Sequence, residues 1–126
     1  NDLLRPDCYF IMNKKEIKDK SKFLLQKVGL NPEEYMDRYP RELSGGELRR
    51  VTIARALMNY PKIILADEPT SDLDVENTKE VLEILKEINK KNNTTIILVT
   101  HDLACLEYAD KIYTMVSGKI EEGKNI

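Results

Sequence analysis

The stretch KIILADEPTSDLD, residues 62–74, decides the fold of this chain. It begins with an unbroken apolar run and then changes abruptly to acids, a proline and turn-forming residues. A short continuous apolar run is typical of a strand that is buried on both faces of a parallel sheet. We therefore expect a strand that ends at Asp67, followed by a loop in which Asp74 caps the next helix.

The residues beyond Asp74 extend this pattern toward the C-terminus. Residues 75–90 predict an amphipathic helix, and its apolar face carries Val81, Leu82, Leu85 and Ile88. A second apolar and β-branched run, TTIILVT, follows at residues 94–100. Strand, helix and strand in this order form a right-handed crossover unit, so we expect an α/β chain with a parallel sheet.

The C-terminal residues predict three further elements. Residues 102–109 indicate a shorter helix, residues 111–116 a third strand, and Ser117-Gly118 a turn.

The N-terminal residues are mainly helical in pattern. A stripe of apolar residues from Lys14 to Val28 predicts a helix that stops at Gly29. Asn31-Pro32 is typical of a cap followed by proline in the first helical turn, so a short helix should begin there. Residues 1–13 fit either a short strand or a packed loop.

Composition narrows the class of protein. The chain has 126 residues, of which 41% are hydrophobic and 33% charged, and its net charge of -2 gives no general attraction for nucleic acid. No apolar run approaches the roughly 20 residues of a membrane helix, and the N-terminus lacks the layout of a signal peptide. Cys8 and Cys105 have no metal or redox spacing, so we expect reduced packing residues in a cytoplasmic protein.

The helix expected to run from Ser44 to about Asn59 begins with two consecutive glycines, Gly45 and Gly46. Ser44 and Glu47 have the spacing of a capping box, which accounts for those two residues but not for the glycines. Glycine costs roughly 1 kcal/mol relative to alanine inside a helix. Two residues without Cβ atoms would let an anion approach the free amides of a helix N-terminus. A capped helix and an anion site both remain open at this point.

Two acids and a histidine follow the predicted strands. Asp67 and Glu68 lie at the C-terminal end of the first strand, and His101 follows the second. In an open α/β sheet ligands bind at that edge, so we expect the three side chains to lie near one another. Asp67 suits Mg²⁺, through water, and Glu68 suits a general base for an attacking water molecule.

Four motifs together carry a family resemblance. LSGGE at 43–47, IILADE at 63–68, SDLD at 71–74 and His101-Asp102 resemble, in order and spacing, the motifs of ABC-type ATPase domains. The resemblance implies a P-loop NTPase (RecA-like) fold, with a parallel sheet and helices on both faces, here incomplete. It further implies that residues 1–43 are part of a helical subdomain and residues 44–126 the C-terminal half of the ATPase core.

The same resemblance implies roles for individual residues and the cofactors ATP and Mg²⁺. Asp67 is similar to the Walker B aspartate, Glu68 to the catalytic glutamate and His101 to the switch histidine. The remaining residues would bind nucleotide, through the signature motif and the D-loop: Ser44, Gly45, Gly46, Glu47, Ser71 and Asp74.

The resemblance also implies partners and a location. It implies a second ABC ATPase domain in a head-to-tail dimer, transmembrane transporter subunits, no nucleic acid, and a cytoplasmic position at the inner face of the cell membrane. Residues 35–57 most resemble ATPases of importers. The alternatives are a soluble ABC ATPase of the DNA repair, chromosome or translation type, and a truncated module without catalysis.

One motif of the family is missing from the sequence. No G-x-x-x-x-G-K-[ST] phosphate loop occurs in the 126 residues, so the phosphates of ATP lack a cradle of backbone amides. We expect the chain to be the C-terminal part of a longer protein, inactive alone. In the family the phosphate-loop strand joins the sheet beside the strands at 94–100 and 111–116. Without it, apolar faces and strand edges should stay open and favour self-association.

Overall fold

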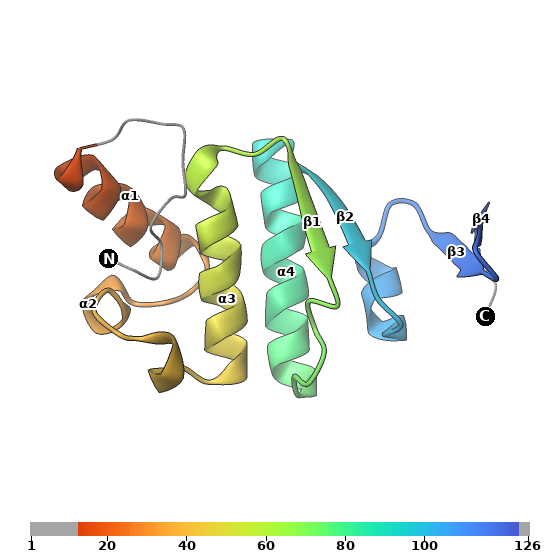
Figure 1. Cartoon of the computed structure of the whole chain (residues 1–126), viewed down its shortest axis with the longest axis horizontal. Coiled ribbons are helices and arrows are strands. Elements are labelled where there is room, and N and C mark those ends of the chain that lie inside the picture. The colour runs from red at the N-terminus through yellow and green to blue at the C-terminus, as the bar shows by residue number, and fades with distance from the viewer. Residues whose placement is uncertain (1–12, 124–126) are drawn as a thin grey trace.

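The computed structural model describes residues 13–123; Cys8 and the ambiguous segment 1–12 lie outside this range. The helices and strands are α1 (Lys14–Lys27), α2 (Pro32–Tyr35), α3 (Gly45–Ala56), β1 (Ile63–Asp67), α4 (Val75–Asn92), β2 (Thr95–Val99), β3 (Tyr113–Val116) and β4 (Lys119–Glu122). Three 3-10 turns, η1 (Pro40–Glu42), η2 (Leu57–Asn59) and η3 (Leu103–Tyr108), complete the list. Figure 1 shows them in layers, with α1 against α3, α3 against α4, and the β1–β2 pair beyond α4.

Local signals set the helix ends as expected. The Asn13 side chain caps α1 by accepting from the amide of Glu16 at 2.8 Å, and Gly29, at φ +79°, follows its end. At α4 the Asp74 carboxylate accepts from the amide of Asn77 at 2.8 Å. These bonds satisfy amides that have no partner within the helix. The segment expected as a helix over 102–109 is instead the 3-10 turn η3.

The predicted crossover unit is confirmed. β1 pairs in parallel with β2, with Ile63 opposite Thr95 and Asp67 opposite Val99, and α4 connects them. Both strands therefore end at the same edge, which brings together the loops that follow them.

The third strand is present but lies outside this sheet. β3 pairs antiparallel with β4 around Ser117 and Gly118, both at positive φ. An antiparallel partner needs only a two-residue turn, whereas a parallel one needs a crossover. β3 therefore forms its backbone hydrogen bonds with β4 and does not join the β1–β2 sheet. Within residues 13–123 that parallel sheet has two strands.

One face of the β1–β2 pair is covered by helices. α4 packs on this face, and a single apolar cluster runs from α1 through α3 to β1 and α4. Its buried members are Leu24, Leu25, Val28, Leu30, Val51, Ala54, Leu57, Met58, Ile64 and Ile88. Cys105 is also buried and forms no disulfide within the described part of the chain.

The other face of the pair is open. Leu65 is 76% exposed, and Ile63, Ile97 and Val99 are at least half exposed. Side chains alternate along a strand, so these four point away from α4. The interpretation of both strands as buried on both faces is wrong for this chain, because residues 13–123 supply helices for one face only. The expectation of open apolar faces is confirmed.

No helix in the described range has the length and apolarity to cross a membrane.

Candidate functional site

The candidate site lies where β1 and β2 end. The chain turns sharply after Asp67, since Glu68 adopts φ +48° while its amide donates to the carbonyl of Val99 at 2.8 Å. A left-handed backbone is uncommon for glutamate and costs of order 1–3 kcal/mol, so surrounding contacts must hold it. Such outliers concentrate at functional sites.

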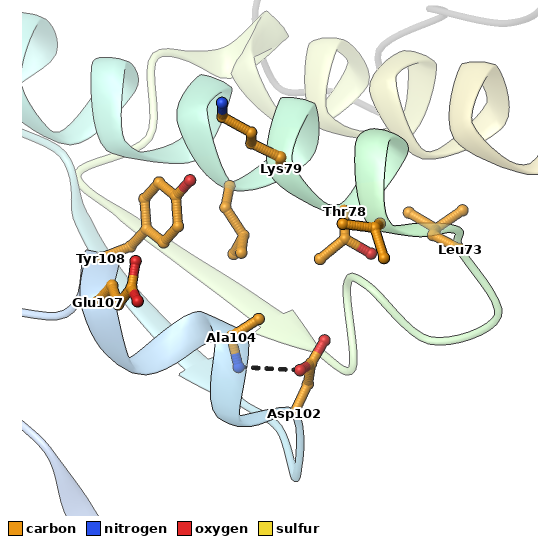
Figure 2. A pocket seen from close by; sticks show the side chains of 9 residues that line it. Leu73, Thr78, Lys79, Asp102, Ala104, Glu107 and Tyr108 are labelled. Atoms are coloured by element: carbon orange, nitrogen blue, oxygen red, sulfur yellow. Dashed lines mark hydrogen bonds between the residues drawn. The ribbon is translucent and has the colours of Figure 1, made fainter.

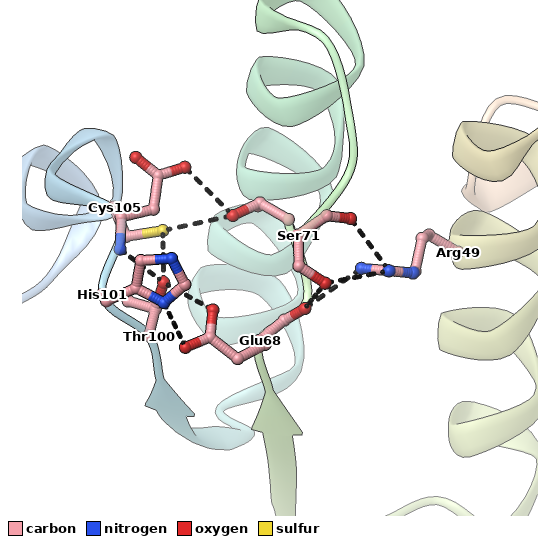
Figure 3. A network of polar contacts seen from close by, with 8 residues as sticks. Arg49, Glu68, Ser71, Thr100, His101 and Cys105 are labelled. Carbon is pink, nitrogen blue, oxygen red and sulfur yellow. Dashed lines mark hydrogen bonds and ion pairs between the residues drawn. The ribbon is translucent and has the colours of Figure 1, made fainter.

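Glu68 and His101 meet at this edge, as expected (Figure 3). Nδ1 of His101 lies 2.8 Å from Oε1 of Glu68, and the hydroxyl of Thr100 donates to Oε2 of Glu68 at 3.4 Å. The Glu68 side chain is 32% exposed and the His101 side chain 88% exposed. A solvent-accessible carboxylate paired with an imidazole can accept and relay a proton.

The same contact shifts the titration of the histidine. The hydrogen bond with Glu68 raises the pKa of His101 above its ordinary value, and the negative charges of Glu68 and Asp102 act in the same direction. These interactions favour the imidazolium form.

Asp67 is the other carboxylate at this edge, and it is exposed. No cluster of three or more acidic, histidine or cysteine side chains suited to a metal occurs among residues 13–123. Mg²⁺ does not require such a cage, because it binds through one or two carboxylates together with phosphate oxygens and water. Asp67 therefore fits one protein ligand of a magnesium–phosphate complex.

Arg49 in α3 holds the acidic loop, and the sequence analysis missed it. Its guanidinium donates to the carbonyl of Glu68 at 3.1 Å, and to the carbonyl and hydroxyl of Ser71 at 2.9 and 3.2 Å (Figure 3). These bonds secure the turn in which Glu68 is strained. The neighbouring Arg50 instead forms an ion pair with Glu80. Nothing in the sequence distinguishes the two arginines, which lie one helical turn after Gly45 and Gly46.

The capping box of α3 is confirmed. The Ser44 hydroxyl accepts from the amide of Glu47 at 3.2 Å, and the Glu47 carboxylate accepts from the amide of Ser44 at 3.0 Å. The Tyr35 hydroxyl donates to the second carboxylate oxygen of Glu47, and this bond is the main cause that lowers the pKa of Glu47. Both carboxylate oxygens are therefore engaged within the fold.

The two glycines of α3 have different surroundings. A Cβ atom on the buried Gly46 would lie 2.3 Å from Oδ1 and 2.7 Å from Cγ of Asn77, which is too close for any packing. A Cβ on the exposed Gly45 would meet only Leu73, at an ordinary 3.6 Å. The capping box does not account for Gly46, but its packing against Asn77 does, without an anion at the helix start. Gly45 has no such packing reason.

Asp74, expected to contact nucleotide, serves the fold through α4. Its carboxylate accepts from both the amide and the side chain of Asn77, the latter at 2.9 Å. These two bonds hold Asn77 where it excludes a side chain at position 46. Ser71 and Asp74 thus belong to one loop with Glu68, whereas Ser44 and Gly45 lie at the start of α3.

A shallow groove of about 290 Å³ lies beside this edge, between α4 and η3 (Figure 2). Its rim mixes one cation, Lys79, with the carboxylates of Asp102 and Glu107. Asp102 accepts there from the amide of Ala104 at 3.0 Å. The groove therefore lies next to the loop of His101 but carries none of the predicted site residues.

The fold is an α/β layer with a parallel strand pair, and Asp67 and Glu68 lie at the C-terminal edge of that pair. Ligands of open α/β sheets bind at this edge. The sequence profile described as "ABC transporter" matches residues 2–71, and this chain belongs to that family.

Individual relatives agree with this membership. The chain is 47% identical over 110 residues to a putative hemin import ATP-binding protein HrtA of Staphylococcus epidermidis, which covers 87% of this chain and 49% of that protein. It is 47% identical over 115 residues to the methionine import ATP-binding protein MetN 1 of Oenococcus oeni, covering 90% of this chain and 32% of that one. The chain thus spans half or less of the curated relatives it matches.

Solved structures agree as well. The dimeric ATP-binding cassette MJ0796 bound to ADP and Pi superimposes with a TM-score of 0.77 and 32% identity, over 94% of this chain and 52% of that one. CbiO1 from Clostridium perfringens, part of the ABC transporter complex cbiONQ, gives a TM-score of 0.79 and 32% identity over 90% of this chain and 45% of that one. The fold is that of the ATP-binding cassettes.

Proposed function

We propose that this chain forms part of the ATP-hydrolysing subunit of an ABC transporter. The observation that carries the proposal is the contact between Glu68 and His101 at the C-terminal edge of the parallel pair, 2.8 Å apart. Family membership supplies the substrate class, a nucleoside triphosphate with Mg²⁺. Within this proposal residues 1–43 belong to a helical subdomain and residues 44–126 to the ATPase core.

In the proposed reaction Glu68 acts on the water that attacks the terminal phosphate. Its carboxylate accepts a proton from that water while His101 and Thr100 hold its two oxygens in place. Asp67 is the residue that would hold Mg²⁺, which neutralises charge on the phosphates when bound. Arg49 keeps the loop of Glu68 fixed during this step.

The start of α3 is proposed to bind the nucleotide of a second ATPase domain in a head-to-tail dimer. Ser44 and Gly45 are exposed, and the first amides of a 12-residue helix point outward from this end. Gly45 is the better probe of this role, because the position of Gly46 is already explained by packing against Asn77.

Transmembrane subunits and a position at the cytoplasmic face of the membrane complete the proposal. The names of relatives include import of hemin and methionine, release of lipoproteins and export of macrolides. These names differ in cargo and direction while sharing an ATP-binding part. The proposal therefore concerns the ATPase step and names no cargo.

The test uses a chimera in which the N-terminal half of the Staphylococcus epidermidis hemin relative precedes this chain. We expect Glu68→Gln to leave ATP binding within about twofold and to slow single-turnover hydrolysis by roughly 10²-fold or more, since a general base acts on the chemical step. Glu76→Gln, an exposed acid in the first turn of α4, is the matched control. Hydrolysis within about twofold of the parent chimera after Glu68→Gln would refute the proposed role.

A further inference from the structure

Few contacts of the His101 side chain fix the position of its ring. Its side chain is 88% exposed, and within residues 13–123 its ring forms a hydrogen bond with Glu68 alone. An exposed side chain with a single polar contact takes its position from the backbone that carries it. The anchoring of residues 100–102 therefore decides whether the ring meets the glutamate.

That backbone is anchored on both sides of the histidine. The amide of Asp102 donates to the hydroxyl of Thr100 at 2.9 Å, which in turn donates to Glu68 at 3.4 Å. One oxygen of the Asp102 carboxylate accepts from the amide of Ala104 at 3.0 Å, and the other accepts from Thr70 at 3.2 Å. Figure 3 shows polar contacts that cross from one loop to the other, and Figure 2 shows the bond between Ala104 and Asp102.

Thr70 joins this series of hydrogen bonds from the loop that carries Glu68. It is 4% exposed, two residues after Glu68, and its hydroxyl also lies 3.8 Å from the buried thiol of Cys105. A buried hydroxyl that donates to a carboxylate makes a hydrogen bond stronger than one between neutral groups. The bond from Thr70 to Asp102 therefore ties the loop of the glutamate directly to the loop of the histidine.

We propose that Thr70 is a positioning residue, which through Asp102 holds His101 within hydrogen-bonding distance of Glu68. Thr70 does not touch the reacting groups. Its hydroxyl fixes Asp102, Asp102 fixes the backbone beside His101, and the ring is presented to the carboxylate. The inference rests on the proposed function only for the role of the Glu68–His101 pair.

His101 is the only histidine in the sequence, so proton NMR reads its titration without assignment. The charged groups that act on it are Glu68, across the contact, and Asp102, beside it. In metal-free buffer the full 126-residue chain should show a pKa above the ordinary 6.5. We expect Thr70→Val to lower the pKa of His101 toward that value, because the contact that favours imidazolium is loosened. Thr70→Ser retains the hydroxyl and should retain the raised pKa.

Thr94→Val is the matched control. Thr94 is 2% exposed, and its hydroxyl donates to the carbonyl of Pro61 at 3.4 Å, so it joins the same two chain segments at the opposite end of the sheet. Thr94→Val should destabilise the chain to a degree similar to Thr70→Val and should leave the pKa of His101 unchanged. If Thr70→Val does not fold, as judged by circular dichroism, Thr70→Ala against Thr94→Ala gives the same comparison.

Two results would overturn the proposal: an unchanged pKa of His101 in folded Thr70→Val, or an equal fall in Thr94→Val. Both are independent of ATP. A chimera that hydrolyses ATP normally after Glu68→Gln would remove the proposed function and leave the positioning result intact. Slowed hydrolysis after Glu68→Gln together with an unchanged pKa of His101 in Thr70→Val would refute the positioning role of Thr70 and leave the proposed function intact.

Discussion

The two faces of the β1–β2 pair are built from the same kinds of residue and have opposite surroundings. On the face toward α4, Ile64 is 8% exposed and joins a cluster that reaches α1. On the other face the adjacent Ile63 is 57% exposed and Leu65 is 76% exposed. Isolated exposed apolar residues are ordinary on protein surfaces, whereas a contiguous apolar group on one sheet face is typical of an interaction surface.

Apolar strand composition therefore does not indicate which of the two sheet faces the described residues cover. Both strands are apolar throughout, as parallel strands covered on both sides are. Residues 13–123 cover one side. The hemin and methionine import relatives are each at least twice as long as the segment that this chain matches.

The largest effect should come from truncating the covered face. We expect Ile64→Ala to lower the free energy of unfolding by about 2–4 kcal/mol, because it removes buried methyl groups and leaves a cavity. Ile63→Ala makes the same chemical change on the open face and should cost less than about 0.5 kcal/mol. Urea unfolding followed by circular dichroism measures both. Equal losses would mean that the open face is covered in solution.

An intermediate effect is expected where α3 meets α4. Gly46→Ala should destabilise the chain by about 1–2 kcal/mol, because its Cβ displaces Asn77, whereas Gly45→Ala should be neutral or stabilising. Asn77→Ala removes the obstructing atoms, so the cost of Gly46→Ala should fall in that background. A cost that is the same with and without Asn77 would contradict the packing explanation.

The smallest effect on unfolding should come from a charge on the open face. Leu65→Lys should change the free energy of unfolding by less than about 0.5 kcal/mol, since the site is exposed. It should nevertheless reduce the self-association that we expect of the wild-type chain, because an apolar sheet face and edge become charged. Sedimentation velocity at several concentrations makes the comparison. A wild-type chain that is monomeric throughout would disprove the expected association.

Features fixed by neighbouring residues could be predicted from the sequence. The caps at Asp74 and Ser44, a helix over residues 75–90 (Val75–Asn92 in the structure) and its flanking strands follow from patterns within a few residues. The meeting of Glu68 with His101 followed from one further rule, that parallel strands end at a common edge.

Features that depend on residues distant in the sequence could not be predicted from it. The contact of Gly46 with Asn77, the bonds from Arg49 to the acidic loop, and the bond from Thr70 to Asp102 each join different elements. No local pattern singles out the residues that make them. The turn at Ser117-Gly118 was predicted, but the pairing of β3 with β4 was not, because the family resemblance placed β3 in a parallel sheet beside a strand that residues 13–123 do not contain.

We propose that Asp67, Glu68 and His101 serve an ATPase site, while the 126-residue sequence contains no phosphate-loop motif to hold the phosphates. The most direct measurement is a titration of the 126-residue chain with a fluorescent ATP analogue and Mg²⁺, alongside the chimera that supplies a phosphate loop. We predict micromolar binding by the chimera and none at micromolar concentration by the chain alone, because a phosphate loop acts through several amides and a lysine together. Micromolar binding by the isolated chain as a monomer would contradict the account.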